Sequence, residues 1–409
     1  MSLSVGKFGF CLYRKMMFPM RPNVAFVASN FAGAVTGTFR RARRVGMQHC
    51  AADALNLVPQ WDGCAHAPWI ERAAELHHAS SSVADGSPVS NIVVGANKGY
   101  DAPSFLSLWS HSLAKRLGGH TWKHLIMAYA RGLAVDKQLC ASCTYAPASK
   151  RKHNFLRMFP TGPCKDEANI RHAKHARSRL VPQVHLLELL PSNRQLIRWL
   201  VNRTDIASFA HVHDLAASNV SSTAFSAPDE SKYAGIEALF LFVPWNLKEK
   251  KRSFRTGATI ETTTIDDFMA RKRLSEAWLV QIDTEGWDAL VLEGMRKSLA
   301  AKRIGFVEFE YSGRNYWSPA SGADRRTLEQ TQRWLGELGY TCFLQTSFDL
   351  APISGPCWRA EFERRHWSNV LCAGREAELS LLYNISAEGK ARRGRMALLS
   401  QHDPSRGSM

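Results

Sequence analysis

Acidic side chains at the ends of apolar segments are the residues of this chain best placed to do chemistry. Glu188 ends the apolar run 184–187, and Asp283 and Glu285 follow the apolar run 278–282. A carboxylate at the carboxyl end of a buried strand points into the crevice where open α/β sheets bind ligands. There it can accept hydrogen bonds from ribose hydroxyls, act as a general base, orient a substrate hydroxyl or bind a metal ion.

Each of these acids also has a plain structural interpretation. A glutamate at the end of a strand is commonly a surface residue, and an aspartate in the first turn of a helix is stabilised by the helix dipole. We therefore interpret Asp288 as a helix-stabilising acid and expect Asp283 to be functional.

A glycine-rich turn after another apolar run supplies a second kind of site. Gly95 and Gly99 follow Ile92–Val94, and an amphipathic segment begins near Pro103. Glycine lacks Cβ, so it allows unusual backbone angles and lets a ligand lie against the backbone. The exposed N–H groups at the start of the next helix favour a polar or anionic ligand group. The pattern predicts a ligand cradle, with a merely tight connection as the alternative.

The elements that must position these residues alternate between strands and helices. Alternation of this kind predicts an α/β protein built on a doubly wound sheet with seven mostly parallel strands, helices on both faces, and insertions. The strands are expected near residues 92–94, 184–188, 206–212, 278–283, 304–311, 340–344 and 367–372. The last two lie close in sequence and are expected to pair antiparallel.

Length and charge divide the 409 residues into three parts. Residues 1–50 are basic and lack acids, which is typical of an organellar targeting segment or a disordered terminus. We expect the catalytic domain at 51–375, with an insertion at about 115–180, and a tail at 376–409 that is partly helical and then basic and disordered. The compartment stays open between an organelle and the cytoplasm.

The net charge of +17 permits an anionic partner, but no nucleic-acid-binding motif accompanies it. The longest apolar stretch, 24–39, is short and interrupted by polar residues, so we expect no membrane anchor.

Nine scattered cysteines argue against a disulfide framework and favour reduced thiols. Cys140 and Cys143 have the spacing of zinc ligands, and Cys164 follows them. A loop insertion with reduced thiols is the preferred interpretation, so no metal is assigned.

Four blocks, in order, resemble the FkbM-type S-adenosylmethionine-dependent methyltransferases. They are Val94-Gly95-Ala96-Asn97-Lys98-Gly99, Leu187-Glu188 with Pro191 and Asn193, Thr264-Ile265-Asp266-Asp267-Phe268, and Ile282-Asp283-Thr284-Glu285-Gly286 followed by Leu292-Glu293-Gly294. The resemblance spans about residues 90–345 and implies a class I methyltransferase (Rossmann-like) fold.

The resemblance also implies roles. The glycine-rich turn would cradle the methionine part of S-adenosyl-L-methionine, and Glu188 would bind the ribose. Asp283 and Glu285 would face the sulfonium and an acceptor, expected to be a hydroxyl on a sugar or small metabolite. The residues implied to bind the cofactor are Gly95, Ala96, Asn97, Gly99 and Glu188.

Two positions depart from the family's pattern. Val93 stands where an acid usually precedes the Val-Gly pair, and Gln281 stands where lysine is usual. An NAD-dependent oxidoreductase is a weaker alternative, because the turn lacks the G-x-G-x-x-G spacing. A non-catalytic or nucleic-acid-associated protein is the other alternative, suggested by the charge and by Val93.

Overall fold

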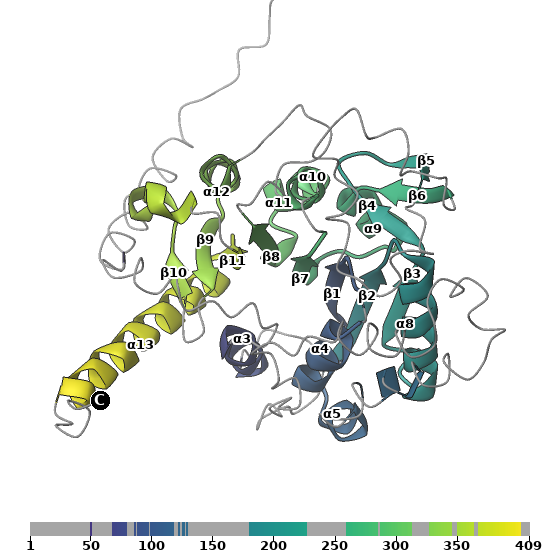
Figure 1. The fold of residues 1–409 in the computed structure, drawn as a ribbon, viewed down its shortest axis with the longest axis horizontal. Helices are drawn as coiled ribbons and strands as arrows, with labels where there is room; N and C mark the ends of the chain where they lie inside the picture. The colour runs from purple at the N-terminus through teal and green to yellow at the C-terminus, as the bar shows by residue number, and fades with distance from the viewer. Residues whose placement is uncertain are drawn as a thin grey trace, which may run out of the picture. The chain divides into compact units, whose positions relative to one another are not determined.

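The computed structural model describes residues 50, 68–79, 86, 88–97, 99–117, 122, 125–126, 128–129, 180–226, 259–284, 287–312, 327–345, 350–363 and 367–401. All of them lie in one compact unit, Gly46–Met409. The elements, shown in Figure 1, are α3 (Pro68–Ala79), β1 (Pro88–Val94), α4 (Asp101–Trp109), α5 (His111–Leu117), β2 (Val181–Leu187), α8 (Pro191–Arg203), β3 (Ala210–His213), β4 (Leu215–Ala217), β5 (Ser222–Ser226), β6 (Thr259–Thr263), α9 (Ile265–Arg271), β7 (Ala277–Ile282), α10 (Asp288–Glu293), α11 (Arg296–Ala300), β8 (Ile304–Ser312), α12 (Leu328–Glu337), β9 (Thr341–Gln345), β10 (Leu350–Pro352), β11 (Trp367–Ala373) and α13 (Glu376–Gln401), with short 3-10 turns at Gly355–Cys357 and Ala360–Glu363.

The main sheet has the strand order β10-β9-β11-β8-β7-β1-β2-β3. β1 lies between β2 and β7 and runs parallel to both, and β3 and β8 continue the parallel part on either side. The chain builds outward from β1 to β3 and then returns to β7, so the order reverses between β1 and β7. This reversal is the switch point at which doubly wound sheets bind their ligands. The expected Rossmann-like α/β fold is confirmed.

The sheet has eight strands, and the expected count of seven was wrong. The additional strand, β10, pairs antiparallel with β9 at the edge of the sheet. β11 pairs antiparallel with β9, as expected for the last two strands, and it also pairs antiparallel with β8. A separate three-stranded sheet, β4-β6-β5, flanks the part of the chain at 227–258 that lies outside the described residues.

β3 begins later than its apolar sequence suggests. Ile206 is buried, but its N–H bonds to the carbonyl of Val201, and its own carbonyl accepts from Phe209 and Ala210. These turn hydrogen bonds replace strand pairing, so β3 starts only at Ala210.

Alternate residues of the central strands bury on opposite faces of the sheet, because strand side chains alternate. Val93 and Leu186 belong to a core with side chains from α3, α4, α5, α8 and α13. Val94 and Leu187 belong to a second core with side chains from α9 to α12. Helices therefore cover both faces, as expected (Figure 1).

The C-terminal segment, expected to be partly helical and then disordered, is helical as far as Gln401. α13 covers Glu376–Gln401, and Leu381, Leu382 and Ile385 are buried in the first core. Ile385 lies four positions after Leu381 and three after Leu382, so these side chains share a helix face, and this packing orders the segment. Residues 1–49, 402–409 and most of the expected insertion at 115–180 lie outside the described residues. Within the described part of the chain, none of the helices combines the length and apolarity that crossing a bilayer requires.

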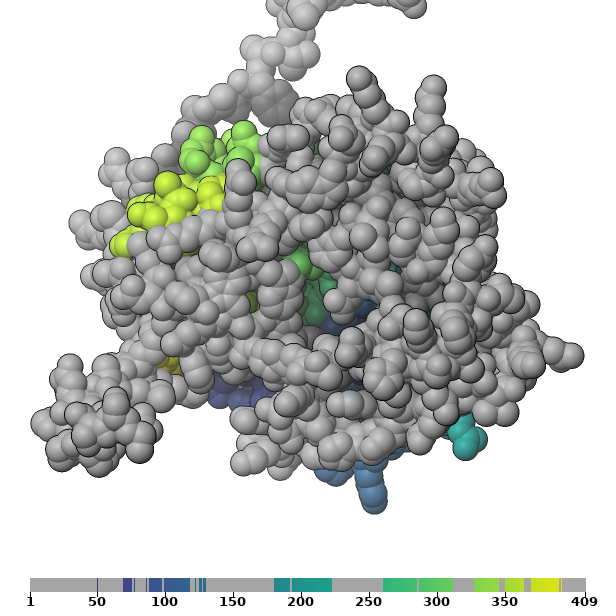
Figure 2. Space-filling model, viewed as in Figure 1, coloured from purple at the N-terminus to yellow at the C-terminus, as the bar shows by residue number. Residues whose placement is uncertain are grey.

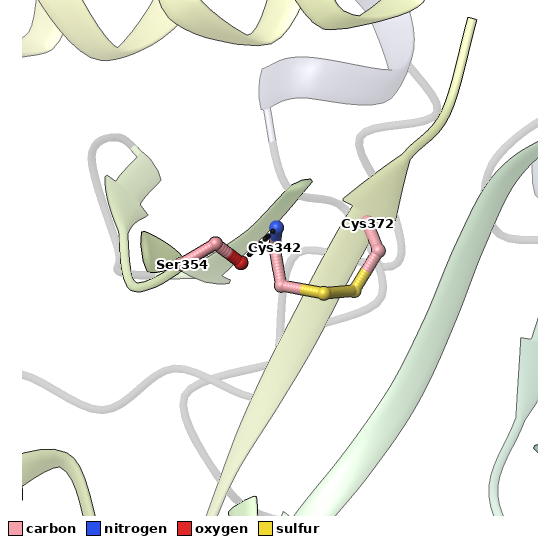
Figure 3. Close-up of a disulfide and its surroundings, with 3 residues drawn as sticks. All are labelled: Cys342, Ser354 and Cys372. Atoms are coloured by element: carbon pink, nitrogen blue, oxygen red, sulfur yellow. Dashed lines mark hydrogen bonds between the residues drawn. A yellow bond between two sulfur atoms is a disulfide. The ribbon is translucent and has the colours of Figure 1, made fainter. Parts of the chain in front are cut away.

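All four cysteines among the described residues form disulfides, so the expectation of mostly reduced thiols is wrong for this part of the chain. Cys342 of β9 and Cys372 of β11 stand directly opposite one another in the antiparallel ladder and are bonded (Figure 3). Cys50 is bonded to Cys357, which lies 307 residues later in the chain. The pairings could not be foreseen because the partners meet only in the tertiary structure.

Candidate functional site

The carboxyl ends of β2, β1 and β7 are held together by backbone hydrogen bonds. The N–H of Gly95 donates to the carbonyl of Leu187 at 3.0 Å, and the N–H of Asp283 donates to that of Val94 at 3.0 Å. The residues that follow these strands are therefore neighbours at the switch point. The structure brings Gly95, Glu188 and Asp283 together, as the sequence predicts.

Gly95 is the position in this group where only glycine fits. Its φ is +78°, in the left-handed region. A Cβ there would lie 1.8 Å from the carbonyl oxygen of Asp283. The missing side chain lets the turn after β1 pass directly over the end of β7. Gly99 also has a positive φ, +72°, and a Cβ there would lie 3.3 Å from the side chain of Ile197.

Glu188 fastens the glycine-rich turn to the end of β2. One carboxylate oxygen accepts from the N–H of Asn97 at 2.6 Å, and the other accepts from the N–H of Leu190 at 2.8 Å. The side chain of Asn193 donates a further hydrogen bond. An ionised carboxylate has about four acceptor positions, so roughly one remains for a ligand hydroxyl.

Burial is the main influence on the charge of Glu188. Only 4% of the residue is exposed. Burial raises the pKa of its carboxyl to about 7, although the hydrogen bonds from Leu190 and Asn97 favour the ionised form. Glu188 can therefore exchange its proton near neutral pH.

Asn97 and Asp283 point to a ligand in different ways. Asn97 has a φ of +47°, and its side-chain oxygen is buried without a hydrogen-bond partner in the described structure. A buried acceptor of this kind is expected to meet a donor from a ligand or a water molecule. Asp283, in contrast, is exposed beyond the end of β7. Ala96 is buried beside the turn, and Glu285 lies outside the described residues.

In Figure 2, green atoms from the part of the chain containing β7 and β8 lie next to blue atoms from the part near β1 and α4, near the middle of the view. These are the strands on either side of the switch point.

A polar network beneath this edge was not found from the sequence. The side-chain oxygen of Gln281 accepts from Asn91 at 2.7 Å. Its nitrogen donates to Glu308 at 3.0 Å and, at 3.4 Å, to Asp101. Gln345 also donates to Glu308, at 2.6 Å. The only signal in the sequence was the polar residue at alternate positions of strands that are otherwise apolar.

Burial shifts two acids of this network toward their neutral form. Burial, followed by the negative charge of Asp283, raises the pKa of Asp101 to about 6. Burial also raises the pKa of Glu308 to about 7, and the charge of Asp101 acts in the same direction. The donors that the described structure gives to Glu308 are all neutral amides, from Gln281, Gln345 and Asn369. Gln281 is one of these neutral donors, whereas a lysine at the same position would give Glu308 a cationic partner.

Replacing Glu308 by glutamine is expected to make folding stability less dependent on pH. In wild type the pKa of this carboxyl rises from 4.5 to about 7 on folding, so the folded state binds more protons between these values. The contribution of Glu308 to stability is therefore greatest at acidic pH and falls as the pH rises through this window, by on the order of 1 kcal/mol for each pKa unit. Urea unfolding at several pH values measures the difference between Glu308→Gln and wild type.

The matched control is Glu329→Gln, which neutralises an exposed carboxylate that is paired with Arg333. Its stability should follow the wild-type pH curve. A constant difference between Glu308→Gln and wild type across the window would show that the acid is ionised in the folded protein throughout.

Three histidines stack near the same edge, but they do not make a metal site. His185 Nδ1 lies 3.1 Å from His213 Nε2, and the ring of His211 stacks on that of His185. Burial is the main factor that lowers the pKa of His185, to about 3, so its ring is neutral. No group of three or more histidine, cysteine or acidic residues in the described ranges is suited to hold a metal ion. Cys140, Cys143 and Cys164 lie outside those ranges.

Comparisons with known proteins place this geometry in context. The sequence model of the methyltransferase FkbM domain matches residues 166–342, which contain Glu188, the main-sheet strands from β2 to β8, and Asp283. No curated protein matches the chain.

Two solved structures share weak similarity. Methyltransferase FkbM from Methylobacillus flagellatus KT is 14% identical with a TM-score of 0.29, and the match covers 48% of this chain. This chain thus spans only 38% of that one. A human methyltransferase 10 domain containing protein is 8% identical with a TM-score of 0.29, over 82% of this chain and 97% of that one. Neither likeness is strong enough to support an argument.

The domain match and the strand ends that meet at the switch point agree with the resemblance found in the sequence. This chain resembles the FkbM methyltransferases, and its residues 166–342 match their domain.

Proposed function

We propose that this protein is an S-adenosylmethionine-dependent methyltransferase that transfers a methyl group to a hydroxyl of a sugar or small metabolite. The observation that carries the proposal is the meeting of Gly95, Glu188 and Asp283 at the switch point of the sheet. The match of residues 166–342 to the methyltransferase FkbM domain supports it.

The residues present fit the proposed cofactor. Gly95 leaves a space that a Cβ would fill, and the buried side-chain oxygen of Asn97 can accept from a ligand amine or hydroxyl. The buried carboxylate of Glu188 has an acceptor position for a ribose hydroxyl. When bound, the cofactor supplies a methyl group on a sulfonium, which is already a good leaving group. The protein's task is then mainly to position the acceptor.

Asp283 is the residue we assign to the acceptor. Its backbone is fixed by the hydrogen bond to Val94, while its exposed side chain is accessible from solvent. A carboxylate in this place can orient the hydroxyl and receive its proton. Burial raises the pKa of the nearby acid Asp101 to about 6. Asp283 is the exposed member of this pair of acids, so it is the one that an acceptor can reach.

Calorimetry with S-adenosylhomocysteine and with NAD tests the cofactor assignment. Binding of S-adenosylhomocysteine without binding of NAD is the expected result. Preferential binding of NAD would support an oxidoreductase, and binding of neither compound at high micromolar concentration would contradict the enzymatic interpretation.

Replacing Asp283 by asparagine is expected to lower turnover about 100-fold or more, because general bases typically contribute this much. The affinity for S-adenosylhomocysteine should stay within about threefold of wild type, since the backbone hydrogen bond to Val94 is unaffected. Transfer of a labelled methyl group to a panel of hydroxyl acceptors gives the turnover. Weakened binding with unchanged turnover would reverse the assigned role.

A further inference from the structure

The two disulfides within the described residues are placed where they hold elements of the folded protein together. Cys342 and Cys372 are fully buried and join β9 to β11 inside the main sheet (Figure 3). The Oγ of Ser354 accepts from the N–H of Cys342 beside the bridge. Cys50 and Cys357 tie the start of the described chain to the segment that precedes β11. Paired cysteines of this kind persist in oxidising compartments and are rare where glutathione keeps thiols reduced.

The sequence also contains acceptor sites for N-linked glycosylation, a modification that accompanies folding in an oxidising compartment. It contains three Asn-X-Ser/Thr triplets in which X is not proline, and this is the acceptor pattern for N-linked glycans. The triplets are Asn202-Arg203-Thr204, Asn219-Val220-Ser221 and Asn384-Ile385-Ser386.

The asparagines of all three triplets are exposed. Asn202 lies in the last turn of α8, Asn219 in the connection between β4 and β5, and Asn384 on α13. Asn219 donates to Glu293 at 3.0 Å, in an exposed hydrogen bond that a glycan could displace at small cost. A bulky, hydrated oligosaccharide can therefore project into solvent from each position.

The acceptor site at Asn202 also leaves the proposed active site open. α8 follows β2, so its C-terminal end lies toward the opposite edge of the sheet from Gly95 and Glu188.

We propose that this chain folds in an oxidising secretory compartment, where it acquires its disulfides and N-linked glycans at Asn202, Asn219 and Asn384. Each bridge forms when two thiols lose two protons and two electrons to an oxidised dithiol oxidoreductase, which is reduced in turn. Each glycan comes from an oligosaccharide linked through a diphosphate to a lipid. The asparagine Nδ2 bonds to the anomeric carbon, the bond from that carbon to the diphosphate oxygen breaks, and the amide loses one proton.

The 409-residue chain, expressed in a eukaryotic cell without an added targeting sequence, provides the test. Treatment with an N-glycosidase is expected to increase its mobility on a denaturing gel. Asn202→Gln, Asn219→Gln and Asn384→Gln should each remove one step of that shift, and the triple variant should show none. Ser221→Thr is the matched control, because it keeps the acceptor pattern at Asn219 and should keep the shift.

A second measurement needs no substitution. The N-glycosidase converts each occupied asparagine to aspartate, which peptide mass spectrometry locates directly. Alkylation without reductant, followed by peptide mapping, should show the Cys342–Cys372 and Cys50–Cys357 linkages. A chain without the mobility shift, or with Cys342 and Cys372 alkylated as free thiols, overturns the proposal. Binding of S-adenosylhomocysteine to the same preparation tests the methyltransferase assignment separately.

Discussion

Replacing Glu188 by glutamine is expected to weaken the binding of S-adenosylhomocysteine by about 10-fold to 100-fold. The glutamate carboxylate accepts from the N–H groups of both Asn97 and Leu190. Glutamine has only one side-chain oxygen, so one buried N–H would lose its acceptor and face an amide donor. An unsatisfied buried donor costs about 1–3 kcal/mol. Since Asn97 belongs to the glycine-rich turn, this loss falls on the proposed cofactor cradle.

The pH dependence of binding provides a second readout of the same residue. The pKa of Glu188 is raised to about 7, and a ligand hydroxyl that donates to the carboxylate favours its ionised form. Wild-type affinity should therefore decrease as the pH falls below 7, while that of Glu188→Gln should lack this component. Calorimetry across this range measures both effects.

Glu261→Gln is the control for this experiment. It removes an exposed carboxylate on β6 that is paired with Arg271, and such surface pairs contribute at most about 1 kcal/mol. Its affinity and thermal midpoint should remain close to those of wild type. If Glu188→Gln behaved in the same way, Glu188 would be neither a support of the turn nor a ligand for the ribose.

Replacing Gly95 by alanine is expected to lower the free energy of unfolding more than the same replacement at Gly86 or Gly99. Its Cβ would lie 1.8 Å from the carbonyl oxygen of Asp283 and 2.8 Å from the carbonyl carbon. These are backbone atoms, so no side-chain rotation relieves the overlap, and β1 and β7 must move apart. The left-handed backbone adds about 1–2 kcal/mol, and overpacking about 1–3 kcal/mol more. Binding of S-adenosylhomocysteine should be lost as well.

Gly86→Ala separates these two contributions. Gly86 has nearly the same φ, +80°, but a Cβ there would meet no atom within 4 Å. Its free energy of unfolding should fall only by the backbone contribution, about 1–2 kcal/mol. Gly99→Ala should lie between the two, because its new contacts are with the side chains of Ile197 and Trp122. Denaturant unfolding of the three variants gives the order, and equal losses at Gly86 and Gly95 would contradict the close approach at Asp283.

Several features of the fold followed from local patterns in the sequence. The apolar runs that end at Val94, Leu187 and Ile282 predicted the strands whose ends meet. A strand that is buried on both faces of a sheet carries apolar side chains on both faces, so it forms a nearly continuous apolar run in the sequence. Gly95 was predicted as a turn residue because a positive φ favours glycine, and this preference depends on the backbone of that one residue alone. Glu188 and Asp283 could be placed because parallel strands bring their carboxyl ends to one edge.

The tertiary structure decided what depends on partners distant in the chain. Gln281 contacts Asp101 across 180 residues, and Cys50 pairs with Cys357 across 307. Neither pairing leaves a local pattern, since side-chain bonding to a remote strand does not change the periodicity of either segment. The role of Glu188 in fastening the turn was likewise visible only in space, because Asn97 precedes it by 91 residues. The sequence by itself determined the strands, the turn and the acids at their ends. Folding determined which acids are buried beside one another and therefore which of them hold protons near neutral pH, because burial and neighbouring charge are properties of the packed chain.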